Sequence, residues 1–249
     1  MKAIVLAAGY GTRLGALTAS IPKPLLEVAG RPILDFLFDW LAEPKRIDEV
    51  LLVCNEHYFS AFEKWKSKAS LAVPVRLLND GSTSKENRLG AIGDLEFALN
   101  CAKVNEPTLV VGADNVSQMP LATLLAFFDK KSASVITYTE PPKKKLSATG
   151  VLSFAEDGRV TSFEEKPKEP RSSYAAPPLY LFTAQALQAV LEFRRELPEL
   201  DAPGHFLAWL HTRIPLYACP LEGERLAIDD AASLAAVDSK MRGLPAASY

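Results

Sequence analysis

The chain has 249 residues, of which 48% are hydrophobic and 23% are charged, with a formal net charge of -2 and a sequence pI near 6.0. This composition supports a sizeable core and excludes a disordered or fibrous protein. The weakly acidic balance argues against a protein that coats nucleic acid or an acidic membrane, so an anionic ligand must be met by local cations. We expect neither nucleic acid nor a membrane as a partner.

Cysteine usage and the N-terminal residues indicate the compartment. Cys54, Cys101 and Cys219 lie far apart and lack metal-type spacing, which is typical of a reducing environment and predicts no zinc site. The apolar run from Ile4 to Ala8 is too short for a signal peptide and ends at Gly9, and no apolar stretch reaches membrane-spanning length. We expect a cytoplasmic protein.

Short apolar runs rich in β-branched residues alternate with segments of helical periodicity. This alternation predicts a three-layer, Rossmann-like α/β fold with a mainly parallel central sheet. Strands are expected at 3–8, 49–54, 73–78, 108–111 and 134–139, and helices at 33–41, 58–66, 94–102 and 121–130.

The pattern changes after residue 143. Two apolar runs separated by Asp157-Gly158 predict a hairpin over residues 150–163. Beyond it we expect a strand at 179–182, helices at 184–194 and 205–211, a strand at 216–219 and a last helix from about residue 230. The prediction is one domain spanning residues 1–249, with a substrate-facing hairpin subregion at about 143–182.

A glycine-rich turn follows the first predicted strand and gives the sharpest functional signal. It reads Leu6-Ala7-Ala8-Gly9-Tyr10-Gly11-Thr12-Arg13-Leu14 and is followed by Pro22-Lys23-Pro24. Glycines let backbone amides approach phosphates, but neither a Walker A loop nor the dinucleotide fingerprint fits this spacing. Arg13 suits a leaving pyrophosphate and Lys23 an α-phosphate. The competing interpretation is a turn with two solvated cations.

An apolar strand at 110–112 delivers Asp114 at its carboxyl end, where open α/β sheets bind ligands. Magnesium usually takes one or two protein carboxylates together with phosphates and water. We therefore predict Asp114 as a magnesium ligand. The alternative is an aspartate that caps the following turn.

These motifs resemble the sugar nucleotidyltransferases, the NDP-sugar pyrophosphorylases that include glucose-1-phosphate thymidylyltransferases. Their signature reads approximately LAAGxGTRLxPLTxxxPKPLLxVxGxPxL, and the chain matches it through Leu34 with Ala16 in place of the usual proline. The resemblance implies a GT-A-like fold and an enzyme of the EC 2.7.7 type. Such an enzyme transfers NMP from a nucleoside triphosphate to a sugar 1-phosphate with Mg²⁺ as cofactor. A homodimer is a hypothesis from family habit.

The resemblance also implies roles for individual residues. Arg13 would hold the β- and γ-phosphates, and Lys23 would bridge nucleotide and sugar phosphate; these two are the expected catalytic residues. The other nucleotide-binding positions implied are Leu6, Ala7, Ala8, Gly9, Gly11, Thr12 and Gly90.

A second match, to the pattern GVVxxDxxGxVxxFxEKPK, runs from Gly150 to Lys168. A glutamate beside a lysine suits a sugar phosphate, because the carboxylate accepts bonds from hydroxyls and the ammonium pairs with phosphate. The resemblance assigns Glu165 and Lys166 these roles, with Gly150 and Asn115 as further sugar-phosphate positions. Without the surrounding motifs, the same letters indicate a solvated loop.

The second metal ligand is expected near the C-terminus. Family members carry a pattern like DIGTPEDL, and cytidylyltransferase relatives carry EIDxxEDL. The first pattern places Ala227 at the ligand position, whereas the second supplies Asp229. We favour Asp229, with Asp230 as the N-cap of the last helix; the alternative is that both aspartates only cap that helix.

Two departures leave the substrates open. Pro177-Pro178 removes two backbone donors where the family has a glycine near the sugar. In the loop at 78–94, Gly90 matches but the family's base-reading Gln is absent. This loop is either a base or ribose lid, or a surface loop followed by a helix with Asp94 as its N-cap.

Two other functions remain open at this stage. One is a cytidylyltransferase that uses a non-sugar phosphate or phosphonate acceptor, which the Asp229 pattern favours. The other is a non-catalytic nucleotide-sugar sensor, which Ala227 and Pro177-Pro178 favour. We expect no appended left-handed β-helix or acyltransferase domain.

Overall fold

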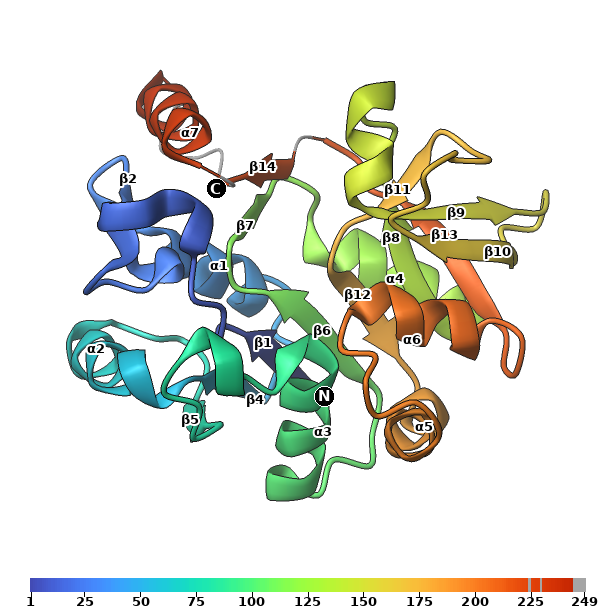
Figure 1. The fold of residues 1–249 in the computed structure, drawn as a ribbon, viewed down its shortest axis with the longest axis horizontal. Coiled ribbons are helices and arrows are strands. Elements are labelled where there is room, and N and C mark those ends of the chain that lie inside the picture. Colours follow the sequence, from blue (N-terminus) through green and yellow to red (C-terminus); the bar gives the residue numbers. More distant parts are fainter. Residues whose placement is uncertain (224, 229, 244–249) are drawn as a thin grey trace. The chain divides into compact units, whose positions relative to one another are not determined.

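The computed structural model describes residues 1–223, 225–228 and 230–243, and these residues divide into two compact units (Figure 1). The first unit contains Lys2–Arg88, Gly112–Ala122 and the described residues from Glu222 onward. The second unit contains Met1, Leu89–Val111 and Thr123–Leu221.

The first unit is built on three parallel strands. They are hydrogen-bonded in the order β1 (Lys2–Leu6), β4 (Glu49–Cys54) and β5 (Val75–Asn79). The middle residues of β1 and nearly all of β4 are buried, as expected for unbroken apolar runs in a parallel sheet covered on both faces. The helices of this part are α1 (Ile33–Ala42) and α2 (Glu56–Lys68).

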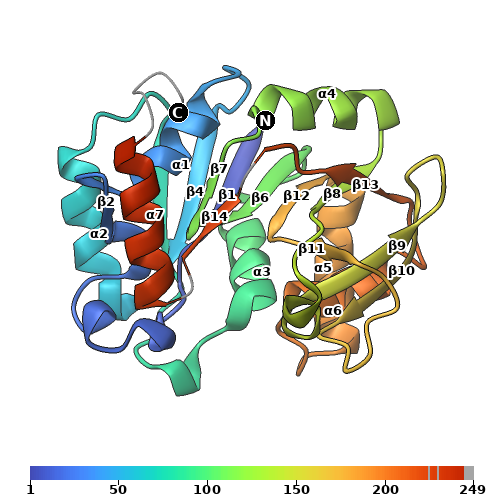
Figure 2. The same cartoon turned by 90° about the horizontal axis from the view of Figure 1, so that it is seen from above.

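Short elements complete the first unit. A two-residue hairpin joins β2 (Glu27–Val28) to β3 (Arg31–Pro32), and β7 (Asn115–Ser117) pairs with β14 (Arg225–Ala227). The last helix, α7 (Ala231–Gly243), lies beside β2 (Figure 2), where the Asp238 carboxylate accepts a 2.8 Å bond from the Ala29 amide. The 3₁₀ helices of this unit span Thr12–Thr18, Lys23–Leu25 and Lys85–Asn87.

The second unit has its own run of paired strands. They follow the order β13 (Leu216–Pro220), β8 (Ser134–Tyr138), β12 (Leu179–Phe182) and β6 (Thr108–Gly112). β8 and β13 are parallel, whereas β12 is antiparallel to both of its neighbours. The helices assigned wholly or mostly to this unit are α3 (Gly90–Ala102), α4 (Leu121–Lys131), α5 (Ala184–Glu196) and α6 (Pro203–Leu210).

The predicted hairpin is confirmed and gains a third strand. β9 (Gly150–Phe154) and β10 (Val160–Glu165) are antiparallel, and β11 (Tyr174–Ala176) pairs with the other edge of β9. A 3₁₀ helix, Lys143–Ala148, leads into this small sheet. Its register sets Glu165 opposite Gly150, which brings two predicted sugar-phosphate positions together.

The start of α3 corrects one expectation. The helix begins at Gly90, four residues before the predicted start, so Asp94 is a buried residue of the helix interior and its assignment as N-cap is wrong. The first-turn amide of Ile92 donates to the Asp201 carbonyl at 3.1 Å, so a backbone acceptor does part of what a capping side chain would do. Sequence patterns do not reveal such a distant partner.

Within the described ranges, none of the helices combines the length and apolarity needed to cross a membrane.

Candidate functional site

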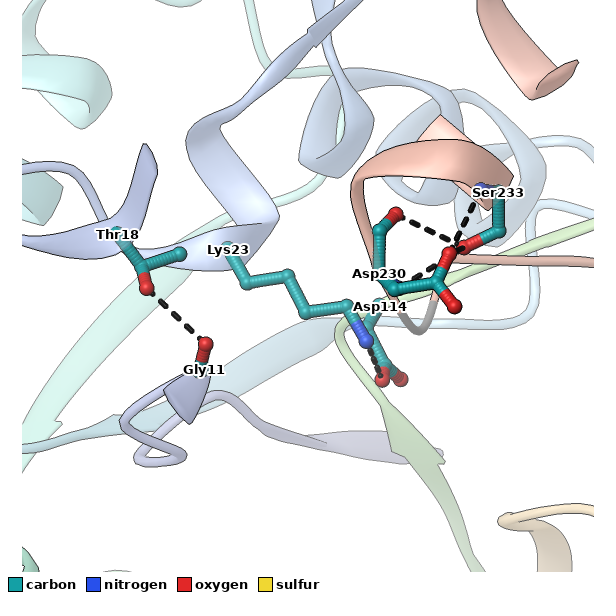
Figure 3. A network of polar contacts seen from close by, with 6 residues as sticks. All are labelled: Gly11, Thr18, Lys23, Asp114, Asp230 and Ser233. Atoms are coloured by element: carbon teal, nitrogen blue, oxygen red, sulfur yellow. Dashed lines mark hydrogen bonds and ion pairs between the residues drawn. The ribbon is translucent and has the colours of Figure 1, made fainter. Parts of the chain in front are cut away.

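The glycine-rich turn after β1 is fixed by its own backbone. The Ala7 amide donates to the Val53 carbonyl at 2.8 Å, and the Asn55 side chain donates to the Ala8 carbonyl at 2.9 Å. Gly11 has a φ of 60°, and a Cβ there would lie 2.9 Å from the Thr18 side chain, whose hydroxyl donates to the Gly11 carbonyl at 3.0 Å (Figure 3). Only glycine fits this conformation and this close approach.

Buried leucines hold the two predicted cations in place. Leu14 follows Arg13, and Leu26 follows Lys23 by three residues; both leucines are buried in one cluster with Val28. The cluster also includes residues of α1, β14 and α7. Because these leucines are packed, the backbone at each cation has little freedom, while the Arg13 side chain remains exposed. Packing therefore positions the cationic side chains of the turn.

The predicted phosphate cation meets the predicted metal ligand. Lys23 Nζ lies 2.6 Å from Asp114 Oδ2 (Figure 3), with the lysine side chain 12% exposed and the aspartate 38% exposed. Asp114 occupies the turn between β6 and β7, and the preceding amide, Ala113, donates to the Leu6 carbonyl at 3.0 Å. This bond fastens the carboxylate-bearing turn to the end of β1.

A cavity of about 250 Å³ opens at this pair. It is lined by Leu6, Ala7, Gly9, Gly11, Thr12, Arg13, Leu14, Lys23, Pro24, Ala113 and Asp114. The structure thus brings together most of the predicted nucleotide positions with the predicted metal ligand. Ala8 is not among the lining residues, and Gly90 belongs to the second unit. Backbone groups, two cations and one carboxylate form a surface suited to a polyphosphate with a bound cation.

The donor set at Asp114 fits a magnesium ion held jointly by protein and phosphates. Among the described residues there is no group of three or more His, Cys, Asp or Glu side chains able to hold a metal alone. Magnesium does not require such a group, because one or two carboxylates suffice when phosphates complete its shell. The second predicted ligand, Asp229, lies outside the described residues.

The strand nearest the C-terminus, β14, nevertheless pairs with the chain directly after Asp114. In the β7–β14 pair, Ala227 lies opposite Asn115, the residue after Asp114. The expected N-cap is confirmed at the residue before α7: the Asp230 carboxylate accepts from the Ser233 amide at 2.8 Å (Figure 3). This bond is the main reason why the Asp230 pKa lies below its usual value, and the Arg13 charge lowers it further.

Three of the four predicted sugar-phosphate residues, Gly150, Glu165 and Lys166, lie together in the second unit, whereas Asn115 belongs to the first. Glu165 ends β10 opposite Gly150, and its Oε1 lies 3.3 Å from Lys166 Nζ. The glutamate side chain is 12% exposed and the lysine side chain 60% exposed. Lys166 has a φ of 47°, and its amide donates to the Thr149 carbonyl at 3.1 Å. The pair therefore combines a mostly buried carboxylate with an exposed ammonium.

Sequence reasoning missed the segment that leads into α6. A Cβ on Gly204 would lie 1.9 Å from Glu165 Oε2, and a Cβ on Gly90 would lie 2.4 Å from the Asp201 side chain. Segment 201–204 thus contacts two predicted ligand positions of its own unit. The available signal was a glycine beside Pro203 at a helix start, where glycine is less favourable than alanine.

The family follows from a comparison with known proteins. A model of the nucleotidyl transferase family matches residues 2–205. The chain belongs to this family. It is 31% identical over 193 residues to the mannose-1-phosphate guanylyltransferase catalytic subunit beta of Drosophila pseudoobscura pseudoobscura, covering 76% of the chain and 50% of the relative. It is 29% identical over 205 residues to a glucose-1-phosphate adenylyltransferase of Desulforamulus reducens, with 76% and 50% coverage.

The chain spans about half the length of the curated family members that it matches. Solved structures of similar fold align with almost the whole of this chain. A UDP-glucose pyrophosphorylase complexed with UDP-glucose gives a TM-score of 0.81 at 18% identity, covering 96% of this chain and 97% of the other. A UTP-bound UGPase from Acinetobacter baumannii gives 0.79 at 17% identity, with 96% and 92% coverage. The likeness confirms the predicted Rossmann-like α/β fold.

Proposed function

We propose that this family member transfers NMP from a nucleoside triphosphate to a sugar 1-phosphate and releases pyrophosphate. The observation that carries this proposal is the 2.6 Å contact between Lys23 and Asp114 at the cavity beneath the glycine-rich turn. A cation suited to phosphate and a carboxylate suited to a metal meet there. Family membership supports the same reaction.

The residues of the turn bind and orient the triphosphate. The backbone from Leu6 to Thr12 contacts base and phosphates, and the Arg13 guanidinium presents several donors to the β- and γ-phosphates. Lys23 neutralises charge at the α-phosphate while a sugar-phosphate oxygen attacks the phosphorus in line. The pyrophosphate then leaves toward Arg13.

Asp114 is the proposed Mg²⁺ ligand on this side of the cavity, and Asp229 is proposed as the second. When bound, Mg²⁺ supplies charge neutralisation on the phosphates during transfer. The turn that carries Asp114 is held to the end of β1 by the bond from the Ala113 amide to the Leu6 carbonyl, which would orient this ligand.

The acceptor needs orientation more than activation. A phosphate monoester is already nucleophilic at neutral pH, so no general base is required and positioning supplies most of the rate. Glu165 accepts bonds from sugar hydroxyls, Lys166 pairs with the sugar phosphate, and Gly150 completes this group in the second unit. Asn115, in the first unit, is proposed as a further sugar-phosphate position. We further propose that the protein works in the cytoplasm and as a homodimer; light scattering that gives a monomer at working concentration would contradict the second point.

The test is pyrophosphate release in the presence of Mg²⁺. Each common nucleoside triphosphate is combined with a panel of hexose, amino-sugar and heptose 1-phosphates and with phosphocholine. Release with one sugar 1-phosphate supports the proposal and names both substrates. Release with phosphocholine alone would favour the non-sugar acceptor, and nucleotide binding without any release would favour a sensor.

A further inference from the structure

The carboxylate of Glu165 lies between two backbone positions that have no side chain. On one side is Gly150 of β9, where an added Cβ would lie 3.3 Å from Glu165 Oε2 and 2.6 Å from the Phe163 ring. On the other side is Gly204 of α6, where an added Cβ would lie 1.9 Å from the same oxygen and 2.8 Å from Glu165 Cδ. The carboxylate is therefore wedged between a strand and a helix.

Backbone conformation does not explain the glycine at position 204. Gly204 lies in the first turn of α6 and is absent from the glycines with positive φ, so alanine would adopt the same backbone and favour the helix more. What rules out alanine is the close approach of Glu165, because a Cβ at position 204 would overlap its carboxylate. A Cβ would also lie 3.1 Å from Phe163, but a few tenths of an ångström of movement would relieve that contact.

We propose that Gly204 is a positioning residue for Glu165 and thereby sets the affinity of the acceptor site for the sugar 1-phosphate. The inference rests on the proposed function, because that function makes Glu165 an acceptor ligand. A methyl group at position 204 would expel the carboxylate from its slot. The Oε1 atom would then also leave Lys166, which now lies 3.3 Å away. The sugar-hydroxyl acceptor and the ion pair that restrains Lys166 would be lost together.

The proposal predicts an effect on the affinity for one substrate only, because the two proposed sites have different lining residues. The Lys23–Asp114 cavity is lined entirely by residues of the first unit, whereas Gly204, Glu165 and Lys166 belong to the second. A change at Gly204 should therefore raise the KM for the sugar 1-phosphate and leave the KM for the nucleoside triphosphate almost unchanged.

A double-mutant cycle of Gly204→Ala and Glu165→Ala tests the proposal. With the pair of substrates found in the panel, Gly204→Ala should raise the sugar 1-phosphate KM about tenfold, and the same change in the Glu165→Ala background should raise it less than about twofold further. Gly243→Ala is the control, since no atom of the described residues lies within 4 Å of a Cβ added at Gly243. Equal effects of Gly204→Ala in both backgrounds would overturn the proposal.

Thermal unfolding of the wild type, Gly204→Ala, Glu165→Ala and the double variant tests the same contact without an activity assay. Gly204→Ala should lower the unfolding temperature of the wild type, and less so or not at all when Glu165 is already alanine. If Gly204→Ala fails to fold, a folded double variant still supports the proposal, and an unfolded one contradicts it. A wild type that releases no pyrophosphate would refute the proposed function, whereas an unchanged sugar 1-phosphate KM in active Gly204→Ala, with a raised KM in Glu165→Ala, would refute only this inference.

Discussion

The two clusters of charged residues hold their carboxylates in different ways. In the first unit, Asp114 is 38% exposed and neutralised by Lys23, a residue 91 positions away in the sequence. In the second unit, Glu165 is 12% exposed and wedged between Gly150 and Gly204, and its lysine is the next residue in the chain. Salt bridging restrains the first carboxylate, whereas packing restrains the second.

The difference predicts different behaviour on ligand binding. Under the proposed function, Lys23 and Asp114 each take a ligand of the opposite sign, so each would leave the other when phosphate and metal bind. Glu165 is already held in position by packing, so under the same proposal its carboxylate would receive the sugar without first leaving a buried partner. Under the proposed function, the first cluster would neutralise charge in the chemical step, and the second would be arranged in advance for recognition.

The largest expected effect comes from breaking the first cluster. Lys23→Ala and Asp114→Ala should each lower kcat by about 100-fold or more, because each removes charge stabilisation at the reacting phosphates. Steady-state pyrophosphate release measures the loss. Arg31→Ala is a matched control, because it removes an exposed cation paired with Asp39 in the same unit and should have little effect. A near-native kcat in either Lys23→Ala or Asp114→Ala would contradict the roles proposed for these residues in the reaction.

A second prediction concerns competition for Asp114. Lys23→Met removes the ammonium but keeps a side chain of similar length, so metal binding in the absence of nucleotide should tighten by about tenfold, or about 1.4 kcal/mol. Titration with Mn²⁺, followed by electron paramagnetic resonance, measures this affinity. Unchanged or weaker binding would show that the lysine does not compete with the metal.

The second cluster should give a smaller effect confined to one substrate. Glu165→Gln keeps the shape but replaces a carboxylate by an amide, so the sugar 1-phosphate KM should rise by about 3- to 10-fold with kcat nearly preserved. The KM for the nucleoside triphosphate is the internal control. A drop in kcat without a change in KM would place Glu165 in the chemical step instead.

The smallest effect lies at the N-cap of α7. Folding lowers the Asp230 pKa, chiefly through the Ser233 amide, so the stability that this carboxylate adds is present above pH 4 or so and is lost as the pH falls through its folded pKa. Asp230→Ala should lower the unfolding temperature at pH 7, while Asp230→Asn keeps a capping oxygen. The advantage of wild type over Asp230→Asn should shrink at acid pH; an advantage that grows there would contradict this account.

Much of the fold could be predicted because its longer strands are largely apolar runs of four to six residues and its longer helices carry a clear period. The short strands β7 and β14 could not, since three residues show no periodicity. Local motifs identified Lys23, Asp114 and Glu165 one by one. Their contacts depend on distant packing, as does the role of Gly204, which reads locally only as a weak helix former.

Product analysis of a single reaction tests the central claim most directly. Wild-type protein, Mg²⁺, the active nucleoside triphosphate and its sugar 1-phosphate are incubated together, and mass spectrometry quantifies both products alongside Lys23→Ala. The account predicts pyrophosphate and NDP-sugar in equal amounts, formed only when the sugar 1-phosphate is present and almost absent in the variant. Pyrophosphate released without the sugar 1-phosphate, or equal yields from the variant, would contradict it.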